Sequence, residues 1–453
     1  MKTFTPSQKS HPPANGSVLI IVMWIVFGLI SIAIYFANSM TFELRAADNR
    51  VAGIEAEQAI EGARRYLSCV LSNLNQAGAI PDPQTYQCEA VPVGNAKFWL
   101  IGRTNEQNVI SSDTPAFGLV DEASKLNLNV ALSNALVFLP RMTPELAASI
   151  VTWRSTNTSN AGIGAESDTY LRQQPPYLCK NAPFETVGEL RLIYMMDMNV
   201  LYGEDANLNG ILDPNENDAD VLPPEDNKDG RLDPGIIEYV TVYTREPANG
   251  TNGSPRYNIT TAAGVTGLRT NLQQLFGTAR ANQILPNRGT NPVTYTSPLQ
   301  FYVTSKMTPT EFAQIEGSIR GTRIQGLVNV NTASVTVLAC LPAMDINSAT
   351  QLANYRQSSQ ADPNTRNSIT WVTSAITDSG IIAQIGPWIT GKSYQFTADV
   401  AAVGHNGRGY RRTRFVFDLS SGAPKILYRQ DLSHLGWALG KQVRNQLLAK
   451  NSP

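Results

Sequence analysis

The longest apolar stretch of the chain lies close to its beginning. From Val18 to Ala37 only Gly28 and Ser31 interrupt large apolar side chains. About 20 residues at about 1.5 Å each reach about 30 Å, the thickness of the hydrocarbon layer of a bilayer. The apolar core of a cleavable secretion signal is shorter, about 7–15 residues, so we predict an anchor that stays in the membrane. The alternative is an ordinary signal peptide, cut after the small residues Ala37 and Ser39.

Beyond this stretch the pattern changes to that of an amphipathic helix. Residues 38–78 contain no proline, and their apolar positions recur every three to five residues, at Val51, Ile54, Ala59, Ala63 and Leu67. Alternating polar and apolar stretches follow at 97–104 and 108–129, and they return at 393–403, 410–420 and 424–432. Alternation of this kind predicts antiparallel strands. We therefore predict an α+β fold, in which a long N-terminal helix packs on a small antiparallel sheet.

The middle of the chain contains an internal repeat. Residues 126–154 and 328–356 align without a gap, and each reads as a helix, a Leu-Pro turn and a second helix. Two copies of one unit are expected, in a form that resembles a helix-hairpin-helix. DNA-binding hairpins carry glycines beside this turn, where backbone N–H groups reach a phosphate. The corresponding places hold other residues, which favours a helical packing module over DNA binding: Arg141, Thr143, Ala343 and Asp345.

The stretch DANLNGILDPNE, residues 205–216, matches the EF-hand calcium loop at every ligand position. Gly210 stands at the sharp turn in the sixth position. Oxygen ligands at this spacing surround a hard cation of calcium size, so we predict that the loop binds calcium. The predicted ligands, with the seventh position acting through its main-chain carbonyl, are Asp205, Asn207, Asn209, Ile211, Asp213 and Glu216.

A second and weaker run, EDNKDGRLDPG at residues 225–235, repeats the beginning of the calcium pattern. Ile236 stands at its twelfth position, where a glutamate is expected, and whether calcium occupies this loop is left open. We expect bare loops without the flanking helices of a full EF-hand, and we expect calcium to hold a partner-facing surface in shape. The candidate ligands of the second loop are Glu225, Asn227, Asp229 and Asp233.

Composition narrows the classes of function. The 453-residue chain has a formal net charge of −1, which gives no electrostatic basis for binding nucleic acid. The stretch GPWITGKS, residues 386–393, matches the P-loop pattern, but an alternating strand follows it where a P-loop requires a helix. The chain has 3 histidines and no Gly-x-Ser-x-Gly motif, and we predict that it is not an enzyme.

The charges that flank the apolar stretch predict its orientation. Lys2 and Lys9 precede it and mixed charges follow it, so the positive-inside rule places the N-terminus in the cytoplasm and the rest outside. Disulfides form in such a compartment. Cys69 and Cys88 are close enough in sequence for a disulfide between a helix end and the next loop, but the alternative of free thiols stays open for all four cysteines, Cys69, Cys88, Cys179 and Cys340.

An anchor helix that continues into an amphipathic helix, behind a short basic leader that ends at Gly16, resembles a type IV pilin or pseudopilin. Over nearly its whole length the chain resembles the K-type minor pseudopilin of type II secretion systems, general secretion pathway protein K. The resemblance rests on the leader, the calcium loop and the stretches GLVDEASKLNLN, MTPELAASIVTWR, PFETVGELRLIYMMD and LVNVNTASVTVLACLP. It implies that prepilin peptidase cleaves between Gly16 and Ser17 and that Ser17 is then N-methylated.

The resemblance also implies an architecture and partners. It implies a pilin-like sheet interrupted by a large, mainly α-helical insertion, in a single-pass protein of the bacterial inner membrane whose bulk is periplasmic. It further implies a place at the pseudopilus tip with the I- and J-type minor pseudopilins and other pseudopilins, in support of protein export. The expected segments are a leader at 1–16, a transmembrane helix at 17–37, its continuation at 38–78, a first sheet part at 79–129, the insertion at 130–384, and a second sheet part with the C-terminal tail at 385–453.

The fifth position of the mature chain departs from the usual pilin pattern. Most pilin-like subunits resemble one another in a glutamate there, which pairs with the N-terminal amine of a neighbouring subunit. Counted from Ser17, this position is Ile21. A lone carboxylate in hydrocarbon costs about 2.5–3.5 kcal/mol, and a subunit at the tip has no subunit above it to provide a partner. Ile21 therefore marks a tip position, with an ordinary anchor residue as the alternative. The alternative function is a membrane-anchored DNA receptor that uses the two hairpins.

Overall fold

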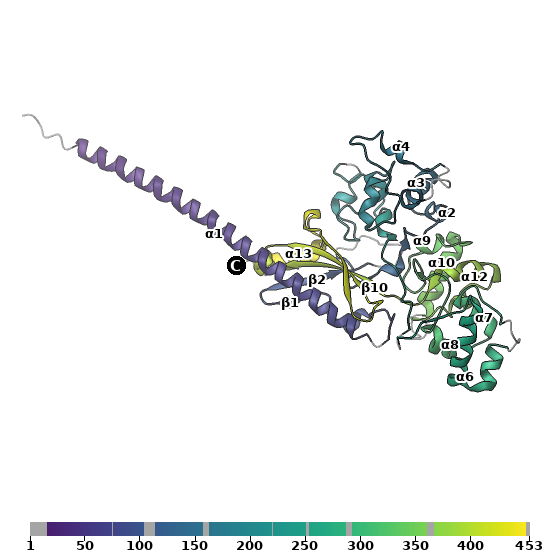
Figure 1. Ribbon diagram of the computed structural model, residues 1–453. Coiled ribbons are helices and arrows are strands. Elements are labelled where there is room, and N and C mark those ends of the chain that lie inside the picture. Colours follow the sequence, from purple (N-terminus) through teal and green to yellow (C-terminus); the bar gives the residue numbers. More distant parts are fainter. Residues whose placement is uncertain are drawn as a thin grey trace, which may run out of the picture.

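A computed structural model describes residues 16–74, 76–103, 114–156, 163–219, 221–250, 253–286, 292–359 and 367–449. Its first element, α1 (Gly16–Ser72), is one long helix whose N-terminal part projects from the body (Figure 1). Among the described residues one helix, Val18–Ser72, is long and apolar enough to cross a membrane. The predicted anchor and the predicted amphipathic helix thus form a single element, which ends before the expected boundary at Gly78.

The C-terminal half of α1 packs closely on a sheet because its inner face is built from alanine. Ala52, Ala56, Ala59 and Ala63 are completely buried, and their small side chains bring the helix axis near the strands. At Gly409, which has a φ of +67°, an added Cβ would lie 2.3 Å from the main chain of Ala52. The turn that contains Gly409 therefore contacts the helix backbone directly.

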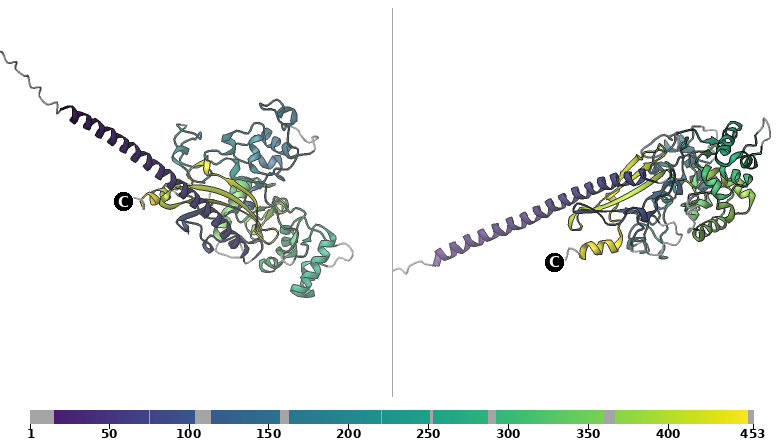
Figure 2. Two further views of the ribbon diagram at one scale, coloured as in Figure 1. Left: turned by 60° about the vertical axis from the view of Figure 1, so that its left-hand side comes forward. Right: turned by 90° about the horizontal axis from the view of Figure 1, so that it is seen from below.

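The sheet is antiparallel and six-stranded, in the order β1-β2-β10-β11-β12, with β3 paired to the other end of β10. Figure 2 shows α1 and α13 (Gly440–Ala449) on opposite sides of the sheet. Alternate residues of the central strand β10 face these two sides: Phe396 and Val400 pack with residues of α1, whereas Ala401 and Val403 pack with Val443 of α13. The predicted helix-on-sheet α+β fold is thereby confirmed. The strands are β1 (Val91–Val93), β2 (Ala96–Ile101), β3 (Val120–Asp121), β10 (Gln395–Val403), β11 (Arg411–Asp418) and β12 (Lys425–Asp431).

The chain between β3 and β10 forms a large insertion with its own hydrophobic core. The expectation of a mainly α-helical insertion needs refinement, because short two-stranded parallel ladders alternate with the helices. These ladders are β4 (Leu126–Asn127) with β5 (Val240–Thr241), β6 (Tyr257–Asn258) with β7 (Ile319–Arg320), and β8 (Val328–Asn329) with β9 (Ile389–Thr390). The helices are α2 (Ser133–Leu136), α3 (Pro144–Arg154), α4 (Ser167–Tyr170), α5 (Met198–Leu201), α6 (Ala262–Ile284), α7 (Pro298–Ser305), α8 (Pro309–Glu316), α9 (Val335–Ala339), α10 (Ile346–Ser359), α11 (Val372–Ala375) and α12 (Ser379–Ile385).

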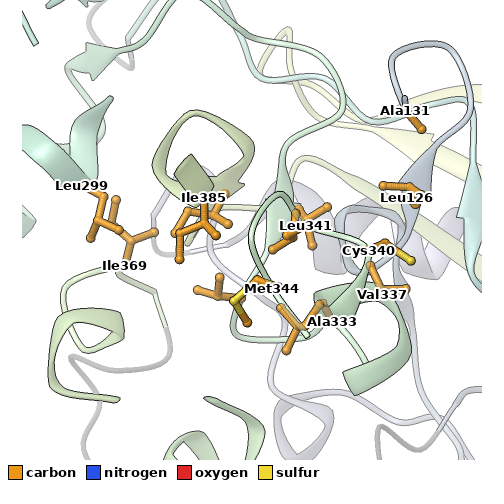
Figure 3. Close-up of a cluster of buried hydrophobic side chains, with 14 of the residues drawn as sticks. Leu126, Ala131, Leu299, Ala333, Val337, Cys340, Leu341, Met344, Ile369 and Ile385 are labelled. Atoms are coloured by element: carbon orange, nitrogen blue, oxygen red, sulfur yellow. The ribbon is translucent and has the colours of Figure 1, made fainter. Parts of the chain in front are cut away.

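The two sequence repeats adopt the same local structure. The Arg154 guanidinium donates to the carbonyl of Ala131, and Arg356 donates to the equivalent carbonyl of Ala333 at 2.8 Å. Side chains of both copies belong to one core, in which Leu126 of the first copy lies beside Cys340 and Val337 of the second (Figure 3). The first strand of each ladder also ends with an asparagine whose Oδ1 accepts the N–H two residues on, at Asn127, Asn258 and Asn329.

Candidate metal centre

The first predicted calcium loop folds around two buried carboxylates at its two ends. Asp205 and Glu216 are each 1 % exposed. Asp205 accepts the N–H groups of Asn209 and Gly210 at 2.9 and 3.0 Å. Glu216 accepts the N–H groups of Ala206 and Asp213 at 3.2 and 2.9 Å. The first and twelfth positions are thus fixed by the main chain of the loop between them.

The polar side chains between these two ends also point into the loop. The amides of Asn207 and Asn209 both donate to Oδ2 of Asp213, at 2.6 and 2.9 Å. Oδ1 of Asn207 is buried and has no hydrogen-bond partner among the described residues. A buried oxygen without a donor is costly, and a cation would satisfy it. The structure therefore brings together the predicted side-chain positions 1, 3, 5, 9 and 12 in one small loop.

The electrostatics of the loop favour a bound cation. Burial and the neighbouring carboxylates of Asp205 and Asp213 raise the pKa of Glu216 to about 9. Burial also raises the pKa of Asp205, against the opposing effect of the Arg103 guanidinium. Buried carboxylates that repel one another resist ionisation unless a positive charge lies among them. A divalent cation at this place would supply that charge and keep both groups ionised.

The second loop repeats these contacts, but with two ligand candidates that the sequence pattern missed. Asn227 donates to Asp233 at 3.3 Å, as the third position donates to the ninth in the first loop. The carboxylate of Glu204 accepts the N–H of Asp233 at 2.9 Å, which is the role of Glu216 in the first loop. Oδ1 of Asn217 accepts the N–H of Gly230 at 3.2 Å, which is the role of Asp205.

Glu204 and Asn217 immediately flank the first loop, so its neighbours complete the second loop. The predicted first ligand, Glu225, is exposed, and it accepts the amide of Asn199 at 2.7 Å. The EF-hand pattern could not have predicted that Glu204 takes the place of the twelfth-position glutamate, because Glu204 lies well upstream of residues 225–235. Asp229 keeps its predicted place, since its Oδ1 accepts the N–H of Arg231 at 2.8 Å.

The donor set fits calcium better than a metal that prefers nitrogen or sulfur. In the described part of the chain no three His, Cys, Asp or Glu side chains gather closely enough to form a metal site by themselves. A site here therefore depends on amide and carbonyl oxygens beside the carboxylates. Calcium accepts 6–8 such oxygen ligands in flexible geometry. The first loop provides an oxygen set of this kind from Asp205, Asn207, Asn209, Ile211, Asp213 and Glu216.

The first loop is attached to the sheet rather than presented to solvent. Arg412 on β11 donates to the carbonyls of Asn207 and Leu208 at 2.5 and 2.6 Å. Arg103, which follows β2, donates to the same Leu208 carbonyl at 2.8 Å. Arg412 is itself completely buried and paired with Asp399 on β10. Two carbonyls of the first loop therefore face the sheet, and the expectation that the loop shapes a partner-facing surface stays a prediction.

Residues 118–202 match the family model described as type II secretion system protein K. Over these residues the chain is similar to the type II secretion system protein K family. Of solved structures, the GspK-GspI-GspJ complex from the enterotoxigenic Escherichia coli type 2 secretion system is similar, with a TM-score of 0.40 and 11% identity over 86% of this chain and 98% of that chain. A comparison with curated proteins gives no match.

The region that matches the protein K family begins before β4, contains the first repeat and ends just before the first calcium loop. It includes the stretches GLVDEASKLNLN, MTPELAASIVTWR and PFETVGELRLIYMMD, on which the resemblance partly rested. The glycine at the start of GPWITGKS serves packing: a Cβ at Gly386 would lie 2.3 Å from Oγ of Ser297.

The remaining predicted residues lie apart from the metal loops. α1 begins at Gly16, and Ile21 is exposed on its projecting part. Residues 1–15, which form the leader before Gly16, lie outside the described residues. All four cysteines are free thiols in the structure, so the alternative of free thiols describes them: Cys69, Cys88, Cys179 and Cys340.

Proposed function

We propose that the chain is a minor pseudopilin that stands at the tip of the type II secretion pseudopilus. The position of the insertion carries this proposal. It lies at the end of the sheet remote from the projecting part of α1 (Figure 1). In a filament whose subunits stack along their N-terminal helices, such an insertion would occupy the space of the next subunit. The absence of a carboxylate at Ile21 supports the same place, since no amine from a subunit above would pair with it.

We infer that its partners are I- and J-type minor pseudopilins. The match of residues 118–202 to the protein K family and the resemblance support this inference, and the solved complex named above contains GspI and GspJ beside its own GspK. The test is co-expression of the full chain with the I- and J-type proteins of the same organism, followed by extraction in detergent and affinity purification. Elution of all three together is expected. Elution of the chain alone, while the I- and J-type proteins elute as a pair, would contradict the proposal.

We further propose that calcium binds the first loop through the oxygens of Asp205, Asn207, Asn209, Ile211 and Glu216, with Asp213 at the ninth position. The orphaned Oδ1 of Asn207 supports it. Calcium would supply positive charge among buried carboxylates. For the second loop we propose a site built from Asn227, Asp229 and Asp233 together with Glu204 and Asn217, in place of Glu225.

A DNA receptor finds no support in the hairpins. The turn residues Arg141 and Ala343 both have positive φ, 55° and 60°, so the two turns share a shape. Asp345, however, caps its helix by accepting the N–H of Ser348 at 2.7 Å, and its carboxylate occupies the place of a phosphate. A gel-shift assay with the full chain in detergent tests this reading. Tight binding of duplex DNA that weakens steeply with salt would overturn it.

A further inference from the structure

A cleft in the insertion is lined by three cationic side chains that form no ion pair among the described residues. It has a volume of about 570 Å³ and lies between the β6–β7 and β8–β9 ladders. Arg320, Arg323 and Lys392 line it, and all three are half-buried. No carboxylate among the described residues lies within ion-pair distance of any of them. Three partly desolvated cations on one cleft repel one another unless an anion joins them.

The acidic residues of the same cleft are already engaged or weakly charged. Glu246 pairs with the buried Arg256 at 2.5 Å and accepts the hydroxyl of Thr390 at 2.6 Å. Glu316 accepts the N–H of Ile369 at 3.1 Å, while its Oε2 is buried without a partner. Burial raises the pKa of Glu316 to about 7, so at neutral pH this group opposes an anion with only part of a charge.

The donors of the cleft are also held ready. The Arg323 guanidinium stacks over the Trp388 ring at 3.7 Å, which fixes its plane and leaves its edge donors free of that contact. Nε of Arg320 is buried and unpaired, as is Nε of Arg256, whose side chain is 7 % exposed at the cleft wall. Unpaired guanidinium donors held in place by packing suit the bidentate recognition of oxyanions.

We propose that this cleft is a binding site for a small dianion that carries carboxylate, phosphate or sulfate oxygens, held by Arg320, Arg323 and Lys392. The site is distinct from a P-loop, although Lys392 belongs to GPWITGKS. The segment runs from a short 3₁₀ turn (Gly386–Trp388) into β9 and then β10, so no helix N-terminus faces the cleft from this segment. In this proposal the three side-chain cations bind the ligand, and the GPWITGKS segment does not form the main-chain cradle of a P-loop.

Equilibrium dialysis of the full chain in detergent with radiolabelled sulfate, at ionic strength held constant with sodium chloride, tests the proposal. One saturable site per chain is expected, and succinate or inorganic phosphate should displace the label. The Lys392→Gln and Arg320→Gln variants should each weaken binding about tenfold, because each removes a charge-assisted hydrogen bond. Glu316→Gln should strengthen it, because it removes the residual negative charge.

The matched control is Lys441→Gln, which removes an exposed cation on α13 and should bind sulfate like the wild type. Lys392→Gln keeps the test valid if Arg320→Gln fails to fold, because no ion pair of Lys392 is lost with it. No saturable binding of sulfate, together with no heat from titration of succinate or phosphate, would overturn the proposal. Equal binding by wild type and Lys392→Gln would overturn it as well.

Discussion

Arg412 on β11 and Asp399 on β10 form an ion pair in which both side chains are completely buried, joined by two hydrogen bonds of 2.8 Å. The remaining donors of Arg412 hold the carbonyls of Asn207 and Leu208 in the first calcium loop. Arg412 therefore connects the sheet to the loop, together with Arg103, which donates to the same Leu208 carbonyl. Arg414 makes a second ion pair with Asp399 at 2.8 Å, and the neighbouring arginines hold the pKa of Asp399 well below its usual range.

Replacing Arg412 by Met tests this attachment. The change leaves Asp399 buried with Arg414 and removes the arginine donor of the Asn207 carbonyl, while the Leu208 carbonyl keeps Arg103. Removal of one partner of a buried pair costs about 3–5 kcal/mol. Urea unfolding of the detergent-solubilised chain, followed by tryptophan fluorescence, should show a loss of this size. Arg411→Met is the matched control: this side chain is half-exposed and lies 3.6 Å from Glu57, so the change should stay within about 0.5 kcal/mol. Equal losses in both variants would contradict the role of Arg412.

Removal of calcium should destabilise the chain. Binding to the folded state alone stabilises by about 2.7 kcal/mol at a hundredfold excess over Kd, so the wild type should melt at a higher temperature in millimolar calcium than in chelator. A double variant with Asp205→Ala and Glu216→Ala loses the two end ligands and should not respond. Glu145→Ala with Asp168→Ala removes two exposed acids outside the loops and should respond like the wild type. The proposal fails if the wild-type melting curve ignores the chelator and elemental analysis finds no calcium.

Calcium binding should also release protons. Because the pKa of Glu216 is raised to about 9 without a cation, its carboxyl group is mostly protonated at neutral pH and must ionise to become a ligand. Titration of the metal-free chain with calcium in weak buffer should release close to one proton per first-loop site at about pH 7, and less above about pH 9. Glu216→Gln should abolish this release. A release that is the same in wild type and variant would assign the proton to another group.

The contact between α1 and the β10–β11 turn should depend on pH. Asp48 and Glu55 accept hydrogen bonds from the two ring nitrogens of His405, at 2.8 and 2.6 Å, and raise the pKa of His405. Since the folded pKa lies above the unfolded value of about 6.5, the protonated ring contributes stability below that pH. This contribution is lost as pH rises through the folded pKa. His405→Gln should narrow the gap in unfolding midpoint between low and high pH, whereas His434→Gln, at an exposed histidine, should leave it unchanged.

Processing should depend on Gly16. We predict that the mature chain begins at Ser17 and keeps its apolar helix, since cleavage at Gly16 removes only the leader. Gly16→Leu should leave the leader in place, because the peptidase must accommodate a backbone without a Cβ at that position. Gly28→Leu, inside the same apolar stretch, should be processed normally. N-terminal sequencing of membrane-extracted protein checks this, and a wild-type start near residue 40 would favour an ordinary signal peptide.

Features that depend on neighbouring residues could be predicted from the sequence alone. The apolar run from Val18, the period of α1 and the alternation in β10 each depend on neighbouring residues, so a helix on an antiparallel sheet was predictable. The ligand spacing within 205–216 was readable for the same reason, because one short loop contains the whole set. The repeat could be recognised in the sequence because both copies bury equivalent side chains in a common core. Leu136 and Leu338, for example, both have to be apolar.

Contacts between distant segments were decided only by the tertiary structure. Arg412 holds the carbonyl of Asn207 across 205 positions of chain, and no local pattern marks it among the other arginines. Glu204 accepts the N–H of Asp233, which lies 29 positions later. It thereby takes the place of the glutamate that the second loop lacks at Ile236. The cations Arg320 and Lys392 likewise meet on one cleft only because two separate ladders pack together. Burial against other segments, rather than sequence spacing, determines which of these charges acquire a partner.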